Sequence, residues 1–367
     1  MLSWDDILDN KLDSDFIGGG EPDKQIKNLS QKDSDNEIKK KVTKAIEEGL
    51  ISECSFAKKE ENTTCIPGEK FEEFEKKALE IIGATNKNGG NKTNKTNNLN
   101  NSNNLNNSNK INSQIVEYFN CGGTETEKCV LKNLRDDKKF NKYFDPAQID
   151  DLIKRFFKPE GPKETFNFLS NHNIDEVLSQ YFHRYNDDEN KFYNIGFQLR
   201  DFAKYNTDLQ NFKFYKEITE NNYKTFAVVI NTDETTGPGI HWFCLFIDAR
   251  NPDRIDIEYF NSSGRPPLPE IQTFLEKTRS ELNNQFDGKR KIDVKYNQGI
   301  QLQEDGHSCG VWSLAYIWLR LEGVPQKWFN PSNIDDSVMH LLRKYFFTND
   351  NKAKRTYGGK KIDDRFL

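Results

Sequence analysis

Four side chains that lie far apart in the sequence have the types needed for chemistry by a thiol nucleophile. Cys309 stands directly before an apolar run, and Gln303 lies a few positions upstream of it. His241 opens an earlier apolar stretch, and Asn261 closes the next one. A thiol, a base, a group that orients the base and an amide donor together allow attack on a carbonyl carbon. The sequence therefore indicates acyl transfer through Cys309.

Two features near Cys309 favour the thiolate, which is the form in which a cysteine attacks. The apolar spacing of residues 311–321 predicts a helix that begins at the thiol, and the positive end of a helix dipole stabilises a negative sulfur. His241 can take the thiol proton and later deliver it to a leaving amine. A lone cysteine at a helix start is more often a small buried hydrophobe, so the hypothesis depends on its partners.

His241 is the preferred base because it follows a glycine-rich turn and opens a predicted strand, which would hold it firmly beside a loop. His307 is the competitor, since it lies two residues from Cys309, but such closeness within one loop would strain the pair. The other histidines fall in helical patterns, where a surface or core role is usual: His172, His183 and His340.

The base needs a neighbour that holds its tautomer, and Asn261 is the predicted one. Its amide oxygen can accept the imidazole N–H without adding charge, although Asn is also common in turns. Asp256 and Glu258 on the preceding strand are alternatives, because a carboxylate would stabilise an imidazolium more strongly. Gln303 is the predicted oxyanion donor, although a Gln in a polar loop is normally only solvated.

The sequence predicts an α+β fold in which strands meet a helix that starts at the thiol. Short β-rich runs predict strands at 226–230, 242–247, 255–260 and 292–296. Helical spacing predicts downstream helices at 269–282, 311–321 and 335–347. It predicts upstream helices at 37–51, 71–82, 148–157 and 174–185, the second of which is expected to end at Gly83.

Changes in composition divide the chain into five expected parts. They are an N-terminal extension with short helices at 1–85, an Asn-rich disordered linker at 86–113, a helical arm at 114–215, the core that carries the four side chains at 216–347 and a polar basic tail at 348–367. The linker consists mainly of Asn with Lys, Thr and Ser, which cannot bury enough apolar surface to offset the entropy of ordering the backbone.

The bulk composition argues against several classes of protein. The 53 basic and 58 acidic residues give a net charge of −5, so a nucleic-acid partner is not indicated. No apolar run is long enough for a membrane span, and the N-terminus lacks a secretory apolar core. Because a catalytic thiol also needs a reducing compartment, the sequence predicts a soluble, intracellular protein.

The remaining cysteines are expected to pack in a core or to do occasional thiol chemistry. Six cysteines in 367 residues do not suggest a disulfide scaffold. Cys54, Cys65, Cys121 and Cys129 fall in the N-terminal half, and neither a CxxC nor an HxxxH pair occurs. We therefore expect no structural metal, and an acyl-enzyme route requires no cofactor.

These residues resemble those of the cysteine protease clan that contains the SUMO proteases and the adenovirus protease. The resemblance rests on Ile240-His241-Trp242 before an apolar strand, and on Gln303 upstream of Cys309-Gly310. Within the clan, the chain is similar to the polyprotein-processing type found in African swine fever virus. The segments that carry this narrower similarity are 173–178, 229–242 and 257–262.

The resemblance implies a SUMO-protease-like core with His241 as base, Asn261 as its orienter, Gln303 as oxyanion donor and Cys309 as nucleophile. Most clan members have Asp at the orienting position, whereas the swine fever virus type has Asn, as here. The resemblance also implies cleavage of viral structural polyproteins after Gly-Gly during virion maturation, in the host cytoplasm and the virion interior. A narrow channel would select glycine, and Trp242 is the candidate for one wall.

Two other functions remain open from the sequence. An isopeptidase acting on SUMO or ubiquitin would also recognise Gly-Gly tails, and a catalytically inactive module could bind such tails without cutting them. The chain itself carries Gly18-Gly19 and Gly358-Gly359 in segments that we expect to be exposed. These pairs suggest self-processing that trims the extensions, although flexible glycine in tails is the simpler interpretation.

Overall fold

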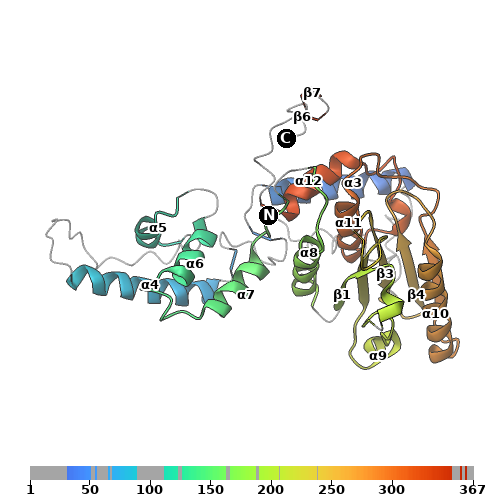
Figure 1. Ribbon diagram of the computed structural model, residues 1–367, viewed down its shortest axis with the longest axis horizontal. Helices are drawn as coiled ribbons and strands as arrows, with labels where there is room; N and C mark the ends of the chain where they lie inside the picture. The colour runs from blue at the N-terminus through green and yellow to red at the C-terminus, as the bar shows by residue number, and fades with distance from the viewer. Residues whose placement is uncertain are drawn as a thin grey trace. The chain divides into compact units, whose positions relative to one another are not determined.

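The computed structural model contains a central mixed sheet with helices packed around it and a separate group of helices (Figure 1). It describes residues 31–50, 54–55, 65–66, 68–88, 111–122, 126–162, 166–186, 190–205, 207–237, 239–348, 356–357 and 360–361. Most of the Asn-rich segment and both glycine pairs considered for self-processing lie outside the described residues. Contacts divide the chain into two units, residues 51–158 and residues 2–50 with 159–367.

The five strands of the second unit pair in the order β1-β2-β3-β4-β5. Their bounds are β1 Phe192–Leu199, β2 Thr225–Asn231, β3 Trp242–Asp248, β4 Arg254–Phe260 and β5 Lys291–Tyr296. Strand β3 is antiparallel to β2 and to β4, whereas β1 runs parallel to β2 and β5 runs parallel to β4. This pairing places the start of β3 and the ends of β2, β4 and β5 at one edge of the sheet.

Helices cover both faces of this sheet. Side chains of α9 Phe214–Thr219 and α10 Pro269–Phe286 pack with one strand face into an apolar core. On the other face α11 Cys309–Leu321 contacts β2 and β3, and α8 Asn171–Arg184 and α12 Asp336–Phe346 pack against α11 (Figure 1). Every residue of α11 is buried, which explains why its sequence is apolar on all sides.

Strand β1 lies within the part of the chain for which we predicted helices. Its register against β2 shifts between Asn194 and Phe197, and Gly196 has a φ of 82°. Such a bulge breaks the alternation of apolar and polar residues that identifies a strand in a sequence. The four strands predicted from regular patterns are all present as β2 to β5.

Helix α3 Gln31–Leu50 belongs to the second unit, where it contacts α12. The Trp328 indole donates a hydrogen bond of 3.2 Å to the carbonyl oxygen of Asp35 on this helix. The expected extension over 1–85 therefore contributes to both units, and the expected arm over 114–215 crosses from one to the other after Lys158. No helix in the described part of the chain is long and apolar enough to span a membrane.

The described residues of the unit 51–158 form four helices. They are α4 Gly68–Asn88, α5 Ser113–Phe119, α6 Thr126–Asp136 and α7 Pro146–Phe156. Ile115, Leu131 and Ile149 are fully buried in its apolar core. Helix α4 continues past Gly83, where we predicted its end, because this glycine does not adopt the left-handed conformation that terminates helices.

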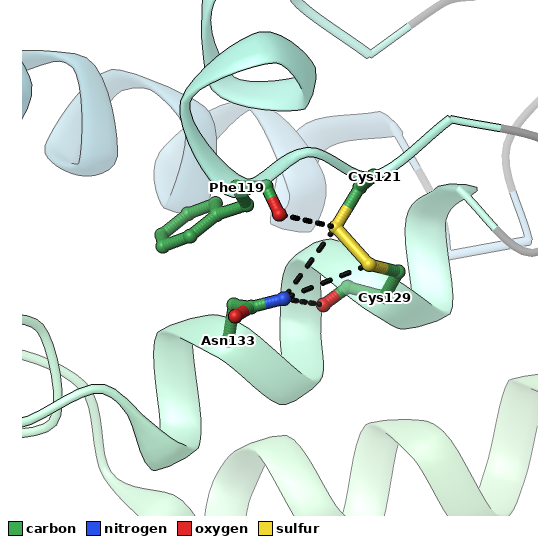
Figure 2. The surroundings of a disulfide bond; sticks show 4 residues. All are labelled: Phe119, Cys121, Cys129 and Asn133. Carbon is green, nitrogen blue, oxygen red and sulfur yellow. Dashed lines mark hydrogen bonds between the residues drawn. A yellow bond between two sulfur atoms is a disulfide. The ribbon is translucent and has the colours of Figure 1, made fainter.

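Two disulfides join the four cysteines of this unit, so the expectation that the cysteines form no disulfide scaffold was wrong. Cys54 pairs with Cys65 and Cys121 with Cys129, at Cα separations of 5.0 and 5.7 Å. Figure 2 shows the second bond, beside which the Asn133 amide donates to the Cys129 carbonyl oxygen at 2.9 Å. The cysteine count was taken over the whole chain, whereas disulfides are common in small units with a limited core of their own.

Candidate active site

Three of the predicted site residues lie where elements begin or end at one edge of the sheet. His241 directly precedes β3, Asn261 directly follows β4, and Cys309 is the first residue of α11. The backbone N–H of Trp242, the residue after His241, is near enough to the Cys309 sulfur to lower the pKa of that thiol. The start of β3 therefore brings the predicted base and the predicted nucleophile into the same region.

Asn261 holds the His241 ring in a defined orientation. His241 Nε2 lies 2.8 Å from Asn261 Oδ1, and Asn261 Nδ2 donates to the Tyr259 hydroxyl at 2.9 Å. Because the amide nitrogen is engaged with Tyr259, its oxygen faces the imidazole, which must donate its Nε2 proton. That tautomer leaves His241 Nδ1 as the atom that can accept a proton from a thiol.

The backbone of Asn261 is fixed by a second asparagine, which the sequence analysis missed. Asn297 Oδ1 accepts the Asn261 N–H at 2.8 Å, and Asn297 Nδ2 donates to the Asn261 carbonyl oxygen at 2.7 Å. The two residues meet because β4 and β5 are parallel and end at the same edge. An Asn directly after a predicted strand was the available signal for this role.

The carboxylates considered as alternatives to Asn261 have other partners. Glu258 accepts hydrogen bonds of 2.7 Å from both Tyr316 and Arg320, so it neutralises a buried guanidinium on α11. Asp256 forms ion pairs with Arg254 at 3.1 Å and Lys295 at 2.8 Å. Neither carboxylate has an ion pair or hydrogen bond with His241 among the described residues, so both alternatives were wrong.

Burial sets the resting protonation of the thiol and the imidazole. It lowers the pKa of His241, while the hydrogen bond with Asn261 opposes this effect. Burial also raises the pKa of Cys309, against the backbone N–H groups of Trp242 and Gly310. Both shifts favour a neutral pair at pH 7. Within the described residues no hydrogen bond joins the His241 ring to the sulfur, so the two must approach before proton transfer.

Gln303 is buried and held at both ends of its side chain. Its Oε1 accepts from the Ser262 hydroxyl at 2.7 Å, and its Nε2 donates to the Asp305 carbonyl oxygen at 2.8 Å. The other Nε2 hydrogen has a longer contact of 3.3 Å with Asp305 Oδ1. The longer contact holds its N–H only weakly, so an oxyanion that approaches in the plane of the amide can accept from this N–H while the first two bonds remain.

Two aspartates that the sequence analysis did not consider shape the segment before Cys309. Asp305 accepts the backbone N–H of Ser308 at 2.8 Å and its hydroxyl at 2.6 Å. Burial would raise the pKa of Asp305, but hydrogen bonds from His340, Ser308 and His307 hold it well below its usual range. Asp336 Oδ2 accepts the backbone N–H of Asp305 at 2.9 Å, which ties the segment to α12.

The other two residues singled out in the sequence are largely buried. Trp242 is 6% exposed, and its Nε1 donates to the Leu169 carbonyl oxygen at 2.9 Å, so it can offer a substrate only a small part of its surface. The ring of His307, the competing base, packs edge-on to Phe166 at a centroid distance of 5.0 Å. Its Nε2 lies 3.6 Å from Asp305 Oδ2.

Comparison with known proteins identifies the fold and the family. The Ulp1 protease family, C-terminal catalytic domain, matches residues 151–356. A cysteine protease of African swine fever virus is 31% identical over 241 residues, which cover 61% of this chain and 83% of the viral one. A counterpart from another isolate, named SUMO-1 cysteine protease, is 30% identical over 240 residues, with the same coverage of both chains.

The fold agrees with this assignment. A crystal structure of the African swine fever virus protease superposes with a TM-score of 0.58 at 22% identity, covering 81% of this chain and 96% of that chain. The family match over residues 151–356 includes the mixed sheet and the helix that begins at Cys309. The chain therefore belongs to the Ulp1 protease family and is a cysteine protease with a SUMO-protease-like α+β core and a helical N-terminal region.

Proposed function

We propose that this protease cuts viral structural polyproteins after Gly-Gly during virion maturation, in the host cytoplasm and the virion interior. Its similarity to a viral cysteine protease over 83% of that protein's length supports the comparison of roles. The observation that carries the catalytic proposal is the 2.8 Å contact of His241 with Asn261, at the strand start that also reaches Cys309.

In the proposed first step, His241 Nδ1 takes the proton of Cys309 Sγ as the thiolate attacks the carbonyl carbon of the scissile bond. Asn261 Oδ1 accepts a hydrogen bond from the Nε2–H of the imidazolium and keeps the ring in place. The backbone N–H of Trp242 and of Gly310 support the negative sulfur until the carbon–sulfur bond forms. Substrate binding is expected to bring the ring and the sulfur together.

In the second step, the tetrahedral oxyanion receives hydrogen bonds from Gln303 Nε2 and the Cys309 backbone N–H. The imidazolium of His241 then gives its proton to the leaving amine, and the carbon–nitrogen bond breaks to leave a thioester. Water, deprotonated by His241, attacks this thioester and releases the acid, and the proton returns to Cys309. The cycle requires no metal or organic cofactor.

The crowding around Cys309 supports selection of glycine. The nucleophile is only 1% exposed, and a side chain added at Gly310 would come within 3.0 Å of Leu169. We infer that a substrate carbonyl reaches this buried sulfur through a narrow passage, which residues without side chains would fit best. In this proposal the small exposed part of Trp242 forms one wall of the passage.

The test is turnover of a Gly-Gly-Xaa peptide and of matched peptides with Ala at either glycine. We expect cleavage of the Gly-Gly peptide by the wild-type protein and none by Cys309→Ala or His241→Ala. Gln303→Ala should lower kcat by about 100-fold, since one oxyanion donor is lost. Equal cleavage of the Ala-containing peptides would contradict the specificity, and full activity of His241→Ala would contradict the mechanism.

An isopeptidase that acts on ubiquitin-like modifiers is the second candidate, because one relative is named SUMO-1 cysteine protease. Fusions of ubiquitin or SUMO to a reporter supply the same Gly-Gly tail on a folded domain. An endopeptidase for polyproteins should cleave the short peptide at least as efficiently as these fusions. A strong preference for one fusion would favour the isopeptidase.

A further inference from the structure

We propose that Asp305, His307 and His340 form a binding site for a tetrahedrally coordinated divalent cation of the zinc type. One ligand atom from each residue lies within 4.8 Å of the other two. In the part of the chain that the structure describes, this is the single cluster of its kind. None of its members belongs to the proposed catalytic set, although Asp305 accepts a hydrogen bond from Gln303.

The spacing of the ligand atoms suits such an ion. His340 Nε2 lies 3.1 Å and His307 Nε2 lies 3.6 Å from the same oxygen, Oδ2 of Asp305. Bonds of about 2.0–2.2 Å to zinc place the ligands of a tetrahedron roughly 3.3–3.6 Å apart. Two of the three ligand pairs therefore need only small adjustments to accept an ion, and water can take the fourth position.

A second observation points to a ligand at this place. His307 is only 7% exposed, and its Nε2 has no hydrogen-bond partner among the described residues. A buried polar nitrogen without a partner costs roughly 1–3 kcal/mol. The edge-on contact with Phe166 holds the ring so that this nitrogen faces Asp305. An ion bound between them would give this nitrogen a coordinate bond without moving the ring.

The ligand types select the kind of ion. Two imidazoles and one carboxylate suit zinc and its spectroscopic substitute cobalt, whereas calcium and magnesium prefer sites made of oxygen atoms. The side chain of His340 is 38% exposed, which gives an ion a route from solvent to an otherwise buried group.

A bound ion would brace the segment that leads into the nucleophile. Asp305 Oδ1 accepts the backbone N–H of His307 at 3.0 Å and of Ser308 at 2.8 Å, and these bonds can persist when the ion occupies Oδ2. The ion would then join His340 on α12 to the residues just before Cys309. It would replace one hydrogen bond of His340 with a coordinate bond.

The experiment is calorimetric titration of the full chain with zinc chloride. Every protein carries Cys309→Ala, because a free thiol can bind zinc on its own and would confuse the titration. We expect one zinc ion per chain and a rise in Tm on binding. His340→Ala should weaken binding by more than roughly tenfold, since even outer-shell partners of metal sites contribute 10–100-fold. Circular dichroism of the variant checks that it folds.

His172→Ala is the matched control. This exposed imidazole lies 3.2 Å from Glu176, so it forms a histidine–carboxylate pair outside the proposed site. Its removal should leave the affinity unchanged. The cobalt-loaded protein should show the visible absorption of a tetrahedral site, and His340→Ala should lack it.

Two results would overturn the proposal. One is the absence of stoichiometric zinc binding, and the other is binding that His340→Ala and His307→Gln leave unchanged. Because all of these proteins lack the catalytic thiol, a negative result bears on the metal site alone and leaves the proposed proteolysis to its own test.

Discussion

At the scale of single residues, the orientation of His241 depends on an uncharged neighbour. Asn261 fixes the ring at 2.8 Å but supplies no negative charge to stabilise an imidazolium. Burial meanwhile lowers the pKa of His241 and raises that of Cys309. The free enzyme is therefore expected to hold a neutral thiol and a neutral imidazole, and to form the ion pair only as the substrate reacts.

Asn261→Asp tests this description. His241 acts as a base only when neutral, so activity falls as the pH drops through its pKa, and the acid limb of kcat/KM should lie below about pH 6.5. A carboxylate at 261 stabilises the imidazolium, which raises the pKa of His241 and should move this limb upward by about one pH unit or more. Asn261→Ala should lower kcat without that upward shift. An identical pH profile for the wild-type protein and Asn261→Asp would contradict the assignment.

At the scale of elements, loops at one edge of the sheet position the site. The turn after β4 lies against the segment that carries Gln303, and Gly264 allows this approach. A side chain at Gly264 would lie 2.7 Å from the backbone carbon of Ile300, and its φ is 66°. The Gly299 N–H donates to the Gly264 carbonyl oxygen at 2.8 Å, so the two glycines belong to one contact.

A position can require glycine because of a positive φ or because a side chain has no space. The variants Gly264→Ala and Gly299→Ala distinguish these two reasons. Gly299 has a φ of 82° but open space around it. Gly299→Ala should therefore lower the free energy of unfolding only by the cost of a left-handed backbone conformation, about 1–2 kcal/mol. Gly264→Ala should cost roughly 1–3 kcal/mol more, because it also overlaps the backbone of Ile300. Urea denaturation measures the free energies of unfolding. Equal losses for the two variants would show that the overlap is relieved without cost.

Gly264→Ala should also impair catalysis. A shift of Ile300 is transmitted along the chain to Gln303, whose backbone N–H donates to the Ser262 carbonyl oxygen at 3.0 Å. We therefore expect a lower kcat for Gly264→Ala than for Gly299→Ala at a temperature where both are folded.

At the scale of the whole molecule, the two units differ in their cysteine chemistry. The four cysteines of residues 51–158 form disulfides, whereas Cys244 and Cys309 of the second unit are free thiols. The bonds close loops of 11 and 8 residues. The protein thus combines covalent cross-links in one unit with a reaction in the other that requires a reduced sulfur.

Removal of these cross-links should destabilise the protein to a measurable extent. Loops of this size correspond to about 2–3 kcal/mol each in the chain-entropy description. The double variant Cys121→Ser/Cys129→Ser should therefore unfold at a lower urea concentration than the wild-type protein, and reductant should lower the wild-type midpoint. The variant that lacks all four cysteines serves as the control, and a midpoint that still responds to reductant would contradict the explanation.

The sequence by itself determined the reaction type, the family and the elements with regular patterns. Cys309, His241 and Gln303 could be recognised because each has a local context in the sequence. Cys309 precedes a predicted helix, His241 opens a predicted strand, and Gln303 lies in a loop before Cys309. The helices at 269–282 and 311–321 and the strands β2 to β5 were predictable for the same reason, since apolar periodicity is local.

Only the tertiary structure decided which of these groups meet. Strand register selected Asn261 over Asp256 and Glu258, because the sheet edge presents the end of β4 to His241 while the carboxylates pair with cations. The grouping of Asp305 with His340 followed from the packing of α12 on α11, which no sequence spacing encodes. The disulfides and the bulged strand β1 likewise depend on contacts between segments that are apart in the sequence. Such contacts form only when the chain folds, so local residue patterns do not reveal them.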